Sequence, residues 1–384
     1  MSVLNKILIF FIAFFSLANI NLYANFSVVD LLLLFYVSAS FYMIDFKIRR
    51  NTFAFILFAN LSLLLSFIFI FFSKYYFQSF IYLSQLWFVV TALPLFFESL
   101  LLQGKFYDFI RSYLMSFVVI SAGFLVFGIL HFTKGIGSFW IYRLSGLHRI
   151  SFGDTLVSND LGIFFITGIL LIQQQVQNTC KRKVLSILIT IAYLLTLSRT
   201  IAFVAILFWL FYFRKFIFKT FFWGISIILI SFPFIMNIPR VGRLLDFGDG
   251  GNGRLIKIQE AFSNILVFIF PLHGQGENKI VKFEHGVQSI HNFFLNLIVN
   301  IGFIQSLILL IPFLYALTFS LKQKKTESEK IIVFALILQM LVISINALML
   351  TRAIWMAIFL LIFYYVNCSR HALKLQNDES PTCH

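Results

Sequence analysis

The sequence predicts an all-α integral membrane protein that forms a single polytopic membrane domain over residues 1–384. Of its residues, 60% are apolar and only 12% are charged, whereas a soluble domain is ~45–50% apolar and about a quarter charged. The apolar residues form continuous runs long enough to cross ~30 Å of hydrocarbon as helices. They do not alternate as in a membrane β-barrel. Together with a mean hydropathy of +0.93, these patterns exclude soluble enzymes, disordered tails and fibrous proteins.

The apolar runs predict about twelve spanning helices. They lie near 7–23, 28–44, 53–72, 80–102, 112–131, 157–175, 184–198, 201–213, 217–236, 293–320, 331–350 and 354–366. The stretch 184–213 is ambiguous, because Arg199 lies in its middle. One tilted span would bury Arg199 and move the following loop to the cytoplasm, whereas two short spans place Arg199 at an outer turn. We predict two spans here, and the run 331–366 repeats the pattern with Arg352.

The basic residues predict which loops face the cytoplasm. With the N-terminus inside, 18 of the 30 Lys and Arg residues fall in cytoplasmic loops or termini, as the positive-inside rule requires. Nine others lie in two long outer segments, 132–156 and 237–292. Long loops cross a membrane regardless of their charge, so the topology does not require these nine. A basic outer surface beside a bilayer indicates an anionic ligand, and the net charge of +15 does not indicate nucleic acid.

The two outer loops contain candidate anion-binding arginines. Arg143 and Arg149 precede Asn159, and the forked donors of arginine suit phosphate oxygens; an ordinary solvated loop is the alternative. Residues 254–266 have an amphipathic helical period, which predicts a helix lying in the outer interface. Glycines precede Arg254 at its start, where backbone N–H groups could face an anion. The alternative is a flexible turn before that helix.

His291 lies at a predicted membrane boundary, next to Asn292. With an unperturbed pKa of ~6.5, a neutral histidine can accept a proton near neutral pH; the alternative is an interfacial histidine bonded to a backbone carbonyl. A metal site made of His273, His285 and His291 would have spacings that match no zinc pattern. We therefore predict no metal and no cofactor.

Three ionisable residues lie in or beside predicted spans. An ionisable residue there is a functional hypothesis by default, because burying it costs at least ~2.5–3.5 kcal/mol at the bilayer centre. Arg199 and Arg352 at outer turns fit this hypothesis, and snorkelling to the interface is the alternative. Glu98 is either a buried acid or a residue at the cytoplasmic end of its span, and its position favours the second interpretation.

Several short motifs follow one another on the predicted outer side of the chain. They are Ser198-Arg199, Gly253-Arg254, Pro271 with Gly274-Gln275-Gly276, and His291-Asn292-Phe-Phe-Leu followed by Gly302; Arg143, Gly146 and Asn159 are weaker members. In their order and common location these motifs resemble the O-antigen polymerase and O-antigen ligase superfamily of bacterial envelopes. The chain departs from the family pattern at Thr200, where Gly is commoner, and has no Trp in the helix after Arg254.

The resemblance implies a GT-C-like, metal-independent glycosyltransferase of the bacterial inner membrane with its active site facing the periplasm. The donor would be an oligosaccharide on undecaprenyl pyrophosphate, and a chain-length regulator protein is a candidate partner beside the membrane lipid. A polymerase extends another lipid-linked repeat unit, and a ligase uses the lipid A core. A transporter or flippase is the alternative from another class. By resemblance, Arg199 and Arg254 bind pyrophosphate and His291 is the base. The expected substrate-binding residues are Arg143, Arg149, Asn159, Gly276, Asn292 and Arg352.

Overall fold

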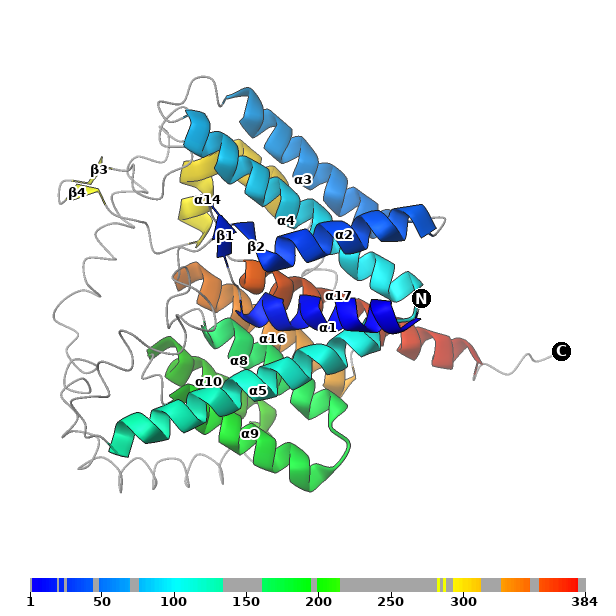
Figure 1. Ribbon diagram of the computed structural model, residues 1–384, viewed down its shortest axis with the longest axis vertical. Helices are drawn as coiled ribbons and strands as arrows, with labels where there is room; N and C mark the ends of the chain where they lie inside the picture. The colour runs from blue at the N-terminus through cyan, green and yellow to red at the C-terminus, as the bar shows by residue number, and fades with distance from the viewer. Residues whose placement is uncertain are drawn as a thin grey trace.

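The computed structural model is a bundle of helices (Figure 1). Two short antiparallel strand pairs accompany the helices, β1 (Asn21–Tyr23) with β2 (Phe26–Ser27) and β3 (Lys282–Phe283) with β4 (Gly286–Val287). The structure describes residues 2–18, 21–23, 26–43, 48–69, 76–133, 161–194, 199–214, 282–283, 286–287, 293–311, 326–345 and 352–378.

Each described helix coincides with a predicted apolar run, and the predicted span 217–236 lies outside the described residues. The helices are α1 (Ser2–Ala18), α2 (Val28–Met43), α3 (Arg50–Ile68), α4 (Tyr76–Leu102), α5 (Phe106–Thr133), α8 (Leu161–Gln175), α9 (Thr179–Leu194), α10 (Arg199–Tyr212), α14 (Phe293–Ile301), α16 (Glu327–Ile345) and α17 (Arg352–Asp378).

Within the described residues, three helical stretches are long and apolar enough to cross a membrane: Arg50–Ile68, Leu83–Leu102 and Phe106–Val126. Five further apolar helices are shorter. The outward faces are also apolar, and α9 exposes Val184, Ile187, Leu188, Ile191 and Leu194 along one stripe, as expected of a helix in contact with lipid. The described part therefore supports a helical membrane protein. Neither a total of twelve spans nor a GT-C-like arrangement follows from it.

Helix α8 is the centre of the bundle. All residues from 161 to 173 are buried, which is the pattern of a helix surrounded by other helices. It packs against α5, α9, α10, α16 and α17. Gly168 brings α8 close to α5, because a Cβ atom there would lie 2.0 Å from the Phe117 ring. Small residues allow such close approach between membrane helices.

The segment around Arg199 forms a helical hairpin. Trp209 Nε1 donates a hydrogen bond of 3.3 Å to Thr190 Oγ1, across 19 residues of sequence. In one continuous helix these residues would be ~28 Å apart, at ~1.5 Å per residue. Two helices are therefore present, as predicted, and Arg199 is the first residue of the second.

The predicted span 293–320 is not continuous over its described part. Gly302 has a φ of +94°, a conformation that a residue with a Cβ rarely adopts, and it separates α14 from a second helical stretch at 303–311. The Ser306 amide and hydroxyl both donate to the Gly302 carbonyl, at 3.0 and 2.7 Å. The prediction of a single helix was wrong here, because apolar composition does not reveal a break at one glycine.

Candidate functional site

The contacts of α8 fix the direction of its neighbours. Helix α16 runs antiparallel to it: Ser328 bonds to Gln174, and Gln339 donates to Thr167 at 2.7 Å. Nearer the start of α8, a Cβ atom on Gly162 would lie 3.6 Å from Val342.

Helix α10 runs parallel to α8. Tyr212 donates a hydrogen bond of 2.8 Å to Gln173 Oε1, and the methyl group of Thr200 lies 3.8 Å from where a Cβ of Gly162 would be. The start of α10, with Arg199 as its first residue, therefore lies beside the start of α8.

Helix α17 also runs parallel to α8. It begins seven residues after antiparallel α16 ends near the start of α8, and it reaches the end of α8 at Tyr364, whose hydroxyl accepts a hydrogen bond of 2.8 Å from Gln175 Nε2. Arg352, the first residue of α17, precedes Tyr364 by 12 residues, which is ~18 Å of helix. The start of α17 therefore lies toward the level at which α8 and α10 begin. We call this level of the bundle the Arg199 end, and the opposite level, defined by Gln173, Gln174 and Gln175, the glutamine end.

Helices α3 and α14 can be placed relative to the same two ends of the bundle. The Arg49 guanidinium lies 5.5 Å from the Phe363 ring, at the glutamine end, so α3 ends toward the Arg199 end. Near that terminus Ser66 bonds to Ile301, at the end of α14. Figure 1 shows the start of α1 and the end of α17 toward the right of the view, and α14 with β3 and β4 toward the left.

Only two of the predicted site residues lie in described helices. Arg199 and Arg352 are the first residues of α10 and α17, and their side chains are outside the described part. The two helix starts lie at the same level of the bundle. The remaining site residues lie outside the described residues, and their roles stay predictions: Arg143, Arg149, Asn159, Arg254, Gly276, His291 and Asn292.

Glu98 is the main polar group buried at the glutamine end. Its carboxylate is fully buried and accepts hydrogen bonds from Arg49 Nε, at 2.5 and 2.7 Å, and from Thr52 Oγ1, at 2.8 Å. Our two interpretations of Glu98 were therefore not exclusive, because this residue near the end of its helix is also buried. An ion pair between α3 and α4 explains it without any catalytic role.

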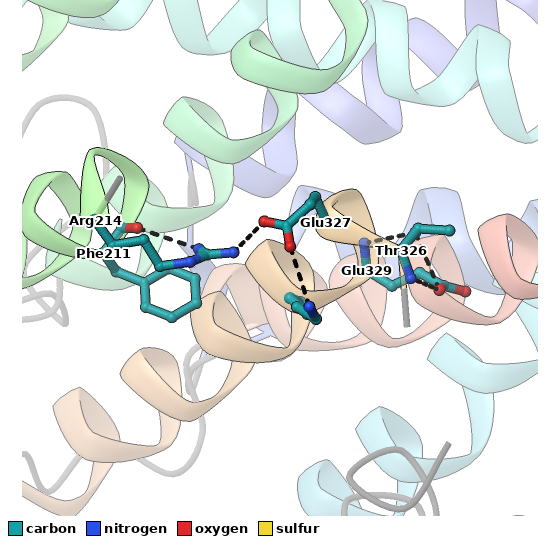
Figure 2. A network of polar contacts seen from close by, with 6 residues as sticks. Phe211, Arg214, Thr326, Glu327 and Glu329 are labelled. Atoms are coloured by element: carbon teal, nitrogen blue, oxygen red, sulfur yellow. Dashed lines mark hydrogen bonds and ion pairs between the residues drawn. The ribbon is translucent and has the colours of Figure 1, made fainter. Parts of the chain in front are cut away.

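A second ion pair links α10 to α16 at the same end. Figure 2 shows Arg214 bonded to Glu327. The Arg214 guanidinium also lies over the Phe211 ring, 4.3 Å from its centroid. Beside it, Thr326 and Glu329 form a capping box that starts α16: the Thr326 amide donates to Glu329 at 2.9 Å and the Glu329 amide to Thr326 at 3.3 Å. Reciprocal bonds of this kind satisfy free helix-terminal donors.

Three consecutive glutamines at the end of α8 connect it to four other helices. Gln173 bonds to α9 and α10, Gln174 to α16, and Gln175 to α17. Sequence reasoning missed this role, although three polar residues ending an apolar run were a visible signal.

Nearby, burial lowers the pKa of the Lys105 ammonium group, and Asp108 opposes that shift.

Within the described ranges, no three His, Cys, Asp or Glu side chains lie close enough to share a metal ion. The three histidines of the metal alternative lie outside those ranges. No family model, curated protein or solved structure matches this chain.

Proposed function

We propose that this protein polymerises lipid-linked oligosaccharide repeat units by glycosyl transfer from undecaprenyl pyrophosphate at the outer face of a bacterial inner membrane. In this proposal the chain has twelve spans in a GT-C-like arrangement, and the Arg199 end faces the periplasm. The observation that carries the proposal is that α8, α10 and α17 begin at one level of the bundle, two of them with an arginine.

The position of these two arginines favours an anionic ligand. The N-terminus of a helix carries about half a positive charge, and a cation there is disfavoured by roughly 0.3–1 kcal/mol. Arg199 and Arg352 both occupy such positions. A bound anion would reverse the penalty, because it is attracted both to the guanidinium groups and to the helix N-termini. Pyrophosphate, with two adjacent phosphate groups, suits two forked guanidinium donors.

The proposed reaction needs one proton acceptor and stabilisation of one leaving group. An acceptor sugar hydroxyl attacks the anomeric carbon of the donor glycan, its proton passes to His291, and the bond from that carbon to the pyrophosphate oxygen breaks. The lipid pyrophosphate leaves with the bonding electrons, Arg199 and Arg254 stabilise its developing charge, and Arg352 is a further substrate-binding residue beside Arg199. His291 suits the base, because an ordinary imidazole pKa lies near the working pH.

The distribution of buried charge favours surface chemistry over transport. A flippase would be expected to place charges inside several spans. Among the described residues, the buried charged side chains are Asp30, Glu98 and Glu329. Asp30 and Glu329 lie in the first turns of α2 and α16, and Glu98 lies in the last turns of α4.

Purified full-length protein with lipid-linked repeat units tests the proposal. We expect chains of many repeats that form in excess EDTA, and His291→Ala should reduce the rate by ~10²–10⁴, the usual cost of removing a general base. His273→Ala and His285→Ala are matched controls that should keep the wild-type rate.

Three outcomes would contradict this proposal. Transfer to the lipid A core but not to another repeat unit would indicate a ligase. Loss of activity in EDTA with recovery in zinc would favour the metal site, and full turnover in His291→Ala would remove the base.

A further inference from the structure

Gly302 lies between α14 and the helical stretch 303–311, with a φ of +94°. The Gly302 amide donates to the Ile298 carbonyl at 2.9 Å and the Ser306 amide to the Gly302 carbonyl at 3.0 Å, so hydrogen bonds of helical spacing continue on both sides of the break. The direction of α14 relative to that stretch depends on this one non-helical residue and on the contacts that other helices make on either side of it.

Two serines of α3 provide such contacts on either side of the break. Ser66 Oγ lies 3.0 Å from the Ile301 carbonyl, just before Gly302, and Ser62 Oγ lies 2.6 Å from the Gln305 carbonyl, just after it. Both serines are fully buried. The Ser66 hydroxyl also lies 3.1 Å from the Ser62 carbonyl in its own helix, so its proton is shared, and the Ser62 bond is the shorter of the two contacts to the broken helix.

We propose that Ser62 and Ser66 are positioning residues that set the placement of α14 relative to the stretch 303–311, and that the reaction of His291, which precedes α14 in the chain, depends on this placement. This inference rests on the proposed function, because it assumes that His291 reacts. His291 precedes the first residue of α14, Phe293, by two positions. A slip of one residue in α14 would move its start by ~1.5 Å and rotate it by ~100°. A displacement of ~1 Å caused far from the chemistry can cost ~10²-fold in rate.

The pairing suits this role because it spans the break. The two serines are one helical turn apart on α3 and contact carbonyls that are four residues apart on an antiparallel partner. Two such contacts fix both the position and the direction of the broken helix, whereas one contact would allow it to pivot. Hydroxyl donors are suitable, because serine side chains form hydrogen bonds across neighbouring membrane helices.

The test compares the Ser62→Ala/Ser66→Ala double variant with wild type in lipid nanodiscs. Ser116→Ala is the matched control, because among the described residues this buried hydroxyl bonds within its own helix α5, to the Ser112 carbonyl at 2.9 Å. We expect the double alanine variant to lose about 10- to 100-fold in kcat with an unchanged KM for the lipid-linked repeat unit. Hydrogen exchange of the amides at 293–301 should become faster. Ser62→Thr/Ser66→Thr, which keeps both hydroxyls, should restore kcat.

An unchanged kcat in the double alanine variant would overturn the positioning role, and so would an equal loss in Ser116→Ala. Unchanged hydrogen exchange at 293–301 would overturn the anchor whatever the activity. A wild-type protein that makes no polymer would instead contradict the proposed function, and the exchange measurement would still decide whether the serines hold α14.

Discussion

The two ends of the bundle differ in where their arginines lie. At one end the arginines form ion pairs, and at the other end arginines are the first residues of helices. At the glutamine end, Arg49 pairs with Glu98 and Arg214 with Glu327, and three glutamines connect α8 to its neighbours. The fold alone explains these groups. At the Arg199 end, Gly162 of α8 lies beside Thr200 and Val342, and Ser66 bonds to the Ile301 carbonyl.

Helix α10 shows the difference within a single element. Its last turn leads to Arg214, which has an acidic partner and an aromatic ring, while Arg199 occupies its first position, where the helix dipole disfavours a cation. A cation at a helix start, which the helix dipole disfavours, is a better candidate for ligand binding than one that the structure shows in an ion pair. On this ground we propose Arg199, and not Arg214, as a ligand-binding arginine.

Removing a buried charge at the glutamine end should lower the free energy of unfolding without changing catalytic activity. Glu98→Gln removes the buried charge that compensates Arg49, and loss of one partner of a buried pair typically costs ~3–5 kcal/mol. We expect chemical unfolding in detergent to show the larger part of this loss of stability. The protein that remains folded should still be active. Arg49→Met/Glu98→Met, which removes both charges, should recover much of the stability. Equal stability of Glu98→Gln and wild type would contradict the structural role of the pair.

A smaller effect is expected at the helix crossings of α8. Gly168→Ala puts a Cβ atom into the buried ring of Phe117, and such overpacking costs ~1–3 kcal/mol. Gly162→Ala is the matched control on the same helix, because its Cβ would meet Val342 and Thr200 at ordinary contact distances. Thermal unfolding of the two variants should show a lower midpoint for Gly168→Ala alone. Similar midpoints would mean that α5 and α8 do not approach closely there.

Hydropathy and charge were sufficient to predict the positions of the described helices, including the hairpin with Arg199 at the start of α10. These features depend on local composition, which a sequence displays directly. The break at Gly302 and the contacts of Ser62 and Ser66 were not predicted. Such features depend on which helix lies next to which, and one chain's apolar pattern does not encode that.

The candidate site was predicted from outer location and motif order. The structure adds that the starts of α8, α10 and α17 lie at one level, which sequence alone could not show because parallel neighbours are far apart in the chain. Glu98 is a case in which the sequence indicated only part of the answer. Its place near a helix end was predicted correctly, but its burial depends on its partner Arg49, which the sequence did not reveal.

The two arginines of α10 offer the most direct test of the account. Chain length of the glycan should be measured in cells with matched membrane levels of Arg199→Ala and Arg214→Ala. We predict that Arg199→Ala loses ~10²–10³ in rate, as removal of one transition-state contact typically does, and makes no long chains. Arg214→Ala should make chains of wild-type length, because an exposed ion pair contributes at most about 1 kcal/mol. Long chains in Arg199→Ala, or an equal loss in Arg214→Ala, would contradict the assignment of chemistry to the Arg199 end.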